Sequence, residues 1–142
     1  MDAHIAIPQL LYRYAELIDA GDLEGAAALF AHARIMLAQG YETDSAGLLE
    51  IWRGRVVIHP GGTPRTRHLV TNPIVEVHEA AGTASCRSCY TVLQQTDTLP
   101  LQVIASGRYF DTFERVDGQW RFTSRDYSHF DMRGDLSQHL LG

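Results

Sequence analysis

The feature that most constrains the fold is a continuous run of strand-like sequence between residues 66 and 127. Three short breaks, Ala81-Gly82, Leu99-Pro100 and Asp117-Gly118, divide it into four segments. Asp-Gly is a strong hairpin signal, because these residues suit a two-residue turn whose twist matches the flanking strands. The pattern therefore predicts an antiparallel meander with strands at residues 67–77, 83–96, 101–116 and 119–127.

Helical patterns occupy the first part of the chain. The first predicted helix starts near Pro8, which suits an initial helical turn, and it stops at Gly21. Asp22 suits the N-cap of a second helix over residues 23–30, and Asp44 lies among capping residues for a third helix that runs through Trp52. A strand is predicted between them at residues 34–39. Helices before a meander indicate an α+β fold, with the helices packed on one curved, mostly antiparallel sheet that encloses a cone.

Size and charge exclude several classes of protein. A chain of 142 residues has the length of one domain, and we expect a single domain over residues 1–142. The formal net charge is −5 and no basic run occurs, which argues against a nucleic-acid partner. Residues 1–5 lack a positive leader, and no run approaches the roughly 20 apolar residues that span a bilayer. We therefore expect a cytoplasmic protein without a membrane partner.

The cysteines and most of the histidines do not form a recognisable metal or redox site. Cys86 and Cys89 have C-x-x-C spacing, but they lie in a predicted strand, where positions three apart face opposite sides. Packing is the expected role of both thiols. The remaining candidates, His59, His78, His129 and His139, are scattered, and no motif for a metal, a phosphate or a dinucleotide occurs. We expect neither a metal nor another cofactor.

His68 and Asp19 are the leading candidates for chemistry. His68 shares a strand face with Val70 and Asn72, and Asp19 ends the first predicted helix, where the helix dipole disfavours a carboxylate. If the side chains meet, the carboxylate fixes the imidazole tautomer and leaves the other ring nitrogen as a base near neutral pH. The alternatives are a histidine satisfied by a backbone carbonyl and an aspartate that only begins a solvated turn.

Two further residues are candidates for supporting roles. Tyr14 could donate a hydrogen bond to a substrate oxygen, but an aromatic residue at helical spacing is also typical of a core. Arg125 could stabilise negative charge on a leaving group. Strand alternation places it on the face opposite Trp120 and Phe122, so it reaches a cavity only if that side faces inward or a bulge shifts the register.

Several segments together resemble the SnoaL-like branch of the nuclear-transport-factor-2-like superfamily. They are residues 11–22 (LYRYAELIDAGD), 28–30 (ALF), 68–72 (HLVTN), 107–111 (GRYFD) and 117–122 (DGQWRF). The resemblance implies a cone-shaped α+β barrel and, through the open face of its sheet, a homo-oligomer such as a dimer or trimer. Within the branch, the chain is similar to hexachlorocyclohexane dehydrochlorinase, bile-acid 7α-dehydratase and, more distantly, scytalone dehydratase.

The resemblance also implies roles for the four candidates. His68 and Asp19 stand where those lyases have a histidine base paired with an aspartate. Arg125 matches an anion-stabilising arginine, and Tyr14 matches a tyrosine that assists a leaving hydroxyl. We therefore expect a cofactor-independent lyase, a dehydratase or dehydrohalogenase, that acts on a cyclic, largely apolar small molecule. An isomerase or polyketide-cyclase-type enzyme with the same base, or a non-catalytic small-molecule-binding module, is the alternative.

Overall fold

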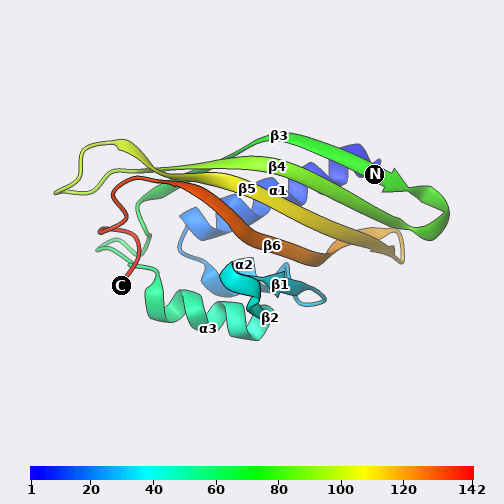
Figure 1. Ribbon diagram of the computed structural model, residues 1–142, viewed down its shortest axis with the longest axis horizontal. Helices are drawn as coiled ribbons and strands as arrows, with labels where there is room; N and C mark the ends of the chain where they lie inside the picture. The colour runs from blue at the N-terminus through cyan, green and yellow to red at the C-terminus, as the bar shows by residue number, and fades with distance from the viewer.

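The computed structural model describes residues 1–142 and places three helices against one curved sheet (Figure 1). The helices are α1 (Ala3–Asp19), α2 (Leu23–Ala28) and α3 (Ser45–Arg55). The strands are β1 (Arg34–Met36), β2 (Glu42–Thr43), β3 (Thr66–His78), β4 (Thr83–Gln94), β5 (Gln102–Val116) and β6 (Gln119–Arg133), and short 3-10 turns lie at Ala38–Gly40 and Glu79–Ala81.

The six strands form one sheet in the order β2-β1-β6-β5-β4-β3. All neighbours are antiparallel except β1 and β6, which are parallel. The predicted meander is thus confirmed, and β6 extends six residues beyond the predicted end at residue 127. The α+β cone expected from the sequence is the observed architecture. No helix is both long and apolar enough to cross a membrane.

Turn chemistry explains how the long strands are joined and where the sheet ends. Asp117 and Gly118 both have positive φ, 52° and 77°, as a two-residue hairpin turn requires. Pro73 lies in β3, which is an edge strand, and the register of β3 against β4 shifts between Thr71 and Ile74. Because proline cannot donate to a ladder, an edge with a bulge is the position that tolerates it.

The predicted start of α1 at Pro8 is wrong. The helix begins at Ala3, and the Asp2 side chain caps it by accepting a hydrogen bond of 2.8 Å from the His4 backbone N–H. Pro8 lies within the second turn, and it leaves the backbone without one helical N–H there. One face of α1 packs on the core, through Leu11, Tyr14 and Ile18 among others.

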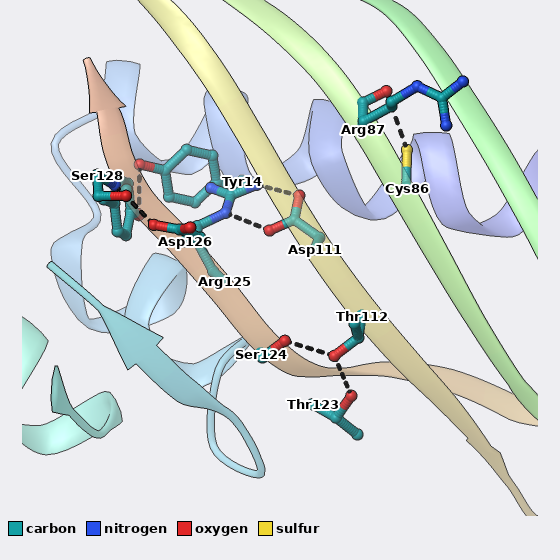
Figure 2. Close-up of polar contacts among 11 residues, drawn as sticks. Tyr14, Cys86, Arg87, Asp111, Thr112, Thr123, Ser124, Arg125, Asp126 and Ser128 are labelled. Atoms are coloured by element: carbon teal, nitrogen blue, oxygen red, sulfur yellow. Dashed lines mark hydrogen bonds and ion pairs between the residues drawn. The ribbon is translucent and has the colours of Figure 1, made fainter. Parts of the chain in front are cut away.

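A bulge in β6 determines where Arg125 lies. Phe113 pairs with Phe122 but Thr112 pairs with Ser124, so Thr123 is an extra residue in β6. The Thr112 hydroxyl contacts those of Thr123 and Ser124 at this point (Figure 2). The extra residue reverses the alternation, and Phe122 and Arg125 are therefore both buried, at 0% and 1% exposure.

Candidate functional site

Asp19 and His68 meet where the end of α1 lies against the start of β3. The Nδ1 atom of His68 is 2.6 Å from Asp19 Oδ1, and the His68 backbone N–H donates to Asp19 Oδ2 at 2.8 Å. The Thr66 hydroxyl donates to Oδ1 at 2.9 Å. The carboxylate therefore accepts three hydrogen bonds from one short segment of β3. Only 8% of the His68 side chain and 15% of the Asp19 side chain are exposed.

This geometry assigns the tautomer of the imidazole. A carboxylate can only accept hydrogen bonds, so Nδ1 of His68 carries the hydrogen and Nε2 carries the lone pair. Nε2 makes no hydrogen bond within the chain, and it is not among the side-chain atoms that are cut off from solvent without a partner. His68 thus has one nitrogen fixed by the acid and one available to an external proton donor.

A groove of about 950 Å³ runs past this pair. Its walls come from α1, the loop before β3, the start of β3 and the end of β4, and they contain both Asp19 and His68. Polar side chains such as Glu16, Arg65 and Gln94 outnumber the apolar ones. The groove is large enough for a drug-sized molecule and offers it both apolar contact and hydrogen bonds.

Tyr14 lies on the inner side of His68 and does not line the groove. Its ring meets the His68 ring edge-on, with the ring centres 6.4 Å apart. The Tyr127 hydroxyl donates to the Tyr14 oxygen at 2.9 Å, and the Tyr14 hydroxyl in turn interacts with Tyr109. Burial raises the pKa of Tyr14 well above its ordinary value of 10, which keeps the phenol protonated.

Arg125 lies deeper, in the core between the sheet and α1, and it does not line the groove either. Its Nε and Nη2 atoms donate to the two carboxylate oxygens of Asp111 at 2.7 and 3.0 Å (Figure 2). The guanidinium lies over the rings of Tyr109 and Tyr14, at 3.8 and 4.5 Å from their centres. Its Nη1 atom is buried without a partner. The structure thus joins Arg125 to the pair of Asp19 and His68 only through Tyr14.

The C-terminal residues, whose role the sequence left unassigned, lie beside His68, although none of them lines the groove. After β6 the chain turns back beside the segment that follows α3 (Figure 1), where Leu140 forms an isolated β-bridge with Val56. His139 on this segment is 8% exposed, and its ring centre is 6.5 Å from that of His68. Nothing in the local sequence marks it, because the contact joins residues 71 positions apart.

Sequence reasoning also missed the partners that hold the candidates in place. The Thr66 hydroxyl donates a hydrogen bond to Asp19, and the Tyr127 hydroxyl donates one to Tyr14. Asp111 forms an ion pair with Arg125. Asp111 belongs to one of the segments that carry the family resemblance, and its position in a predicted strand is the only local signal of its role. An aspartate at a buried strand position indicates a buried cation, but it does not identify which one.

Cys86 is buried and Cys89 half-buried, and both thiols are free.

Solved structures with the same fold come from several bacteria, whereas a comparison with curated protein sequences gives no match. The chain is 27% identical to the protein Rv3472 of Mycobacterium tuberculosis, of unknown function, with a TM-score of 0.71 over 91% of this chain and 72% of that one.

Two proteins of Novosphingobium aromaticivorans share the fold at lower identity. One is a nuclear-transport-factor-2-like protein with a cystatin-like fold, 21% identical, with a TM-score of 0.70 over 87% of this chain and 79% of that one. The other is provisionally assigned as a scytalone dehydratase, 24% identical, with a TM-score of 0.64 over 92% and 89%. The sequence profile of the SnoaL-like domain matches residues 1–126, which contain all three helices and most of the sheet, so the chain belongs to the SnoaL-like domain family.

Proposed function

We propose that the protein is a cofactor-independent lyase whose general base is His68. The observation that carries this proposal is the 2.6 Å contact between Nδ1 of His68 and Asp19, together with the unpartnered Nε2 atom on the other side of the same ring. Nε2 takes a proton from a carbon beside an activating group of the substrate. The electron pair of that C–H bond forms a double bond as the leaving group departs from the neighbouring carbon. Base catalysis of this kind contributes roughly 10²- to 10⁴-fold in rate.

Asp19 and Tyr14 have supporting roles in this reaction. Asp19 holds the imidazole in one tautomer and stabilises the imidazolium that forms when Nε2 is protonated. Tyr14 packs edge-on against the His68 ring and stays a neutral phenol, and in this proposal that phenol supports a leaving oxygen. We assign Arg125 a positioning role, since its guanidinium packs against the Tyr14 ring and not against the groove.

The substrate class follows from the groove. The resemblance favours a cyclic, largely apolar small molecule, and we propose that it carries a polar substituent, because the wall combines Val70 and Leu93 with Gln94 and Arg65. An isomerase or cyclase with the same base is the second candidate, and the free Nε2 favours it equally. Product mass separates the two reactions, since elimination releases water or an acid and isomerisation releases nothing.

The test measures proton abstraction directly. Wild-type protein is incubated in D₂O with a panel of cyclic β-hydroxy ketones and ring halides, and mass spectrometry reports deuterium uptake and loss of the leaving group. His68→Ala and Asp19→Asn should each lose about 10²-fold or more, whereas His78→Gln, at the far end of β3, should keep the wild-type rate. Full activity of His68→Ala on a substrate of the wild type removes the proposal.

Imidazole NMR tests the pair without a substrate and addresses the alternative of a binding module. The hydrogen on Nδ1 of His68 should give a strongly downfield resonance that disappears in Asp19→Asn. A solvent-like titration of His68 that does not respond to Asp19→Asn would favour a module that only binds its ligand.

We also propose that the protein forms a homo-oligomer through the sheet face that the helices leave open. Leu69, Val103, Phe110 and Met132 are exposed large apolar residues of β3, β5 and β6. Leu69 alternates with His68, which faces the helices, and the cross-strand register puts Met132 in the same row as Leu69. Such a face normally marks an interface. Light scattering after chromatography should show a multimer for the wild type and a smaller species for Phe110→Glu.

A further inference from the structure

The C-terminal segment, residues 134–142, is held against the end of the barrel by backbone bonds. The Val57 N–H donates to the His139 carbonyl and the Leu141 N–H to the Arg55 carbonyl, both at 2.8 Å. The carbonyl of Gln138 accepts from the side chains of His59 and Gln94, at 2.7 and 3.0 Å. These contacts fix the backbone on both sides of His139, and they leave its side chain as the part of the segment that faces His68.

The imidazole of His139 is buried and lacks a partner. Its side chain approaches the His68 ring at 69° with the centres 6.5 Å apart, a separation at which one small polar group can contact both rings. Nδ1 of His139 is sealed from solvent and has no hydrogen-bond partner. An unsatisfied buried nitrogen is costly, and proteins rarely keep one without a ligand, a water or a functional reason.

The ring is also held in its neutral form. Burial lowers the pKa of His139 to about 4, and the neighbouring His68 acts in the same direction. A neutral imidazole has one N–H donor and one acceptor nitrogen, so at neutral pH it is suited to bind a hydroxyl or carbonyl oxygen and unsuited to deliver a proton as an acid. The match to the family profile ends at residue 126, so His139 lies outside the matched residues.

We propose that His139 is a second substrate-binding residue of this site, and that its unpartnered Nδ1 bonds to an oxygen substituent of a ring substrate beside His68. The inference rests on the proposed function and narrows it to oxygenated rings, that is, to dehydration or isomerisation. A halogenated hydrocarbon offers no strong hydrogen-bond partner, so it would leave Nδ1 unsatisfied in the complex. Sites built to bond a substrate hydroxyl discriminate strongly against analogues that lack it.

Binding of matched probes tests this proposal without turnover. The probes are 2-tetralone, 2-tetralol, 2-chlorotetralin and tetralin, which share one ring system and differ in the substituent. Dissociation constants come from NMR titration of the full chain. The wild type should prefer the oxygenated probes to tetralin and 2-chlorotetralin by 10-fold or more. His139→Phe should reduce that preference below 2-fold, and His139→Gln, which keeps a donor and an acceptor, should retain part of it.

Two readouts guard against a folding artefact. His129→Phe replaces a histidine on β6 that lies apart from His68 and should keep the wild-type preference. In the unaltered protein, 2-tetralone should shift the Nδ1 resonance of His139 and tetralin should not. Equal binding of all four probes by the wild type, absence of binding by all of them, or an unchanged preference in His139→Phe overturns the proposal. Failure of the proposed function is separate, because it appears as deuterium exchange that does not depend on His68.

Discussion

The buried pair of Asp111 and Arg125 offers the sharpest test of how the core is held together. Both side chains are fully buried, and two hydrogen bonds join them. Asp111→Asn keeps the size of the side chain and one acceptor oxygen but removes the charge that neutralises the guanidinium. Loss of one partner from a buried ion pair costs about 3–5 kcal/mol, because the other charge is left unpaired in a medium of low polarity. With a urea dependence of about 2 kcal/mol per molar, the unfolding midpoint should fall by about 1.5–2.5 M.

The assay is urea unfolding at fixed protein concentration, followed by circular dichroism and by tryptophan fluorescence. Glu76→Gln is the matched control, because Glu76 forms a cross-strand pair with Arg87 in which both side chains are more than half exposed. Removal of a surface pair should change the free energy of unfolding by less than about 1 kcal/mol. The double variant Asp111→Leu with Arg125→Met should lose clearly less than the sum of the single variants Asp111→Leu and Arg125→Met, because no charge remains buried. A midpoint shift below 0.5 M in Asp111→Asn, or strict additivity, would refute this account.

Three further predictions concern pH, the turn and the acid of the site. His139 stays neutral when folded, with a pKa of about 4, but titrates near 6.5 when unfolded, so stability should fall as the pH drops from 6.5 to 4, by about 2 kcal/mol at pH 5. Urea midpoints at pH 7.5 and 5 check this, and His139→Phe should flatten the difference. Gly118→Ala, at a φ of 77°, should cost about 1 kcal/mol, whereas Gly54→Ala within α3 should stabilise by several tenths, as thermal unfolding would show. Asp19→Asn should reduce turnover more than it reduces affinity for 2-tetralone; an equal loss in both would assign Asp19 to binding alone.

Local sequence signals predict most of the fold, because the helices and strands here are bounded by recognisable capping and turn residues. Such signals are visible in short stretches of sequence. They include the Asp117-Gly118 turn, the caps at Asp22 and Asp44 and the long apolar face of α1. The start of α1 was mispredicted because proline prefers the first turn statistically, whereas here the Asp2 cap and the buried Ala3 and Ile7 extend the helix ahead of it. Burial of an amphipathic face outweighs the missing N–H of Pro8.

The candidate site depends on longer-range contacts, which a single sequence does not encode in its spacing. Asp19 and His68 could be paired only through the resemblance, and the structure brings them within hydrogen-bonding distance. Simple strand alternation places Arg125 on the wrong face of the sheet, because Thr123 is an extra residue in β6. Bulges of this kind have no reliable local signature. The approach of His139 to His68 depends on how the chain returns after β6, and its residues show no distinctive pattern.

The position of Asp19 connects stability with the proposed chemistry. A carboxylate in the last turn of a helix faces the negative end of the dipole, at a cost of about 0.3–1 kcal/mol. Three hydrogen bonds from β3 offset that cost, since those to a charged acceptor contribute roughly 1.5–3 kcal/mol each. Two of the three come from the backbone of His68 and the hydroxyl of Thr66, so the contacts that fasten α1 to the edge strand also orient the imidazole. Substitution of Asp19 should therefore loosen this junction as well as release His68. Thr66→Val separates the two effects, because it removes one bond to Asp19 and leaves the Nδ1 contact in place, and it should lower stability more than turnover.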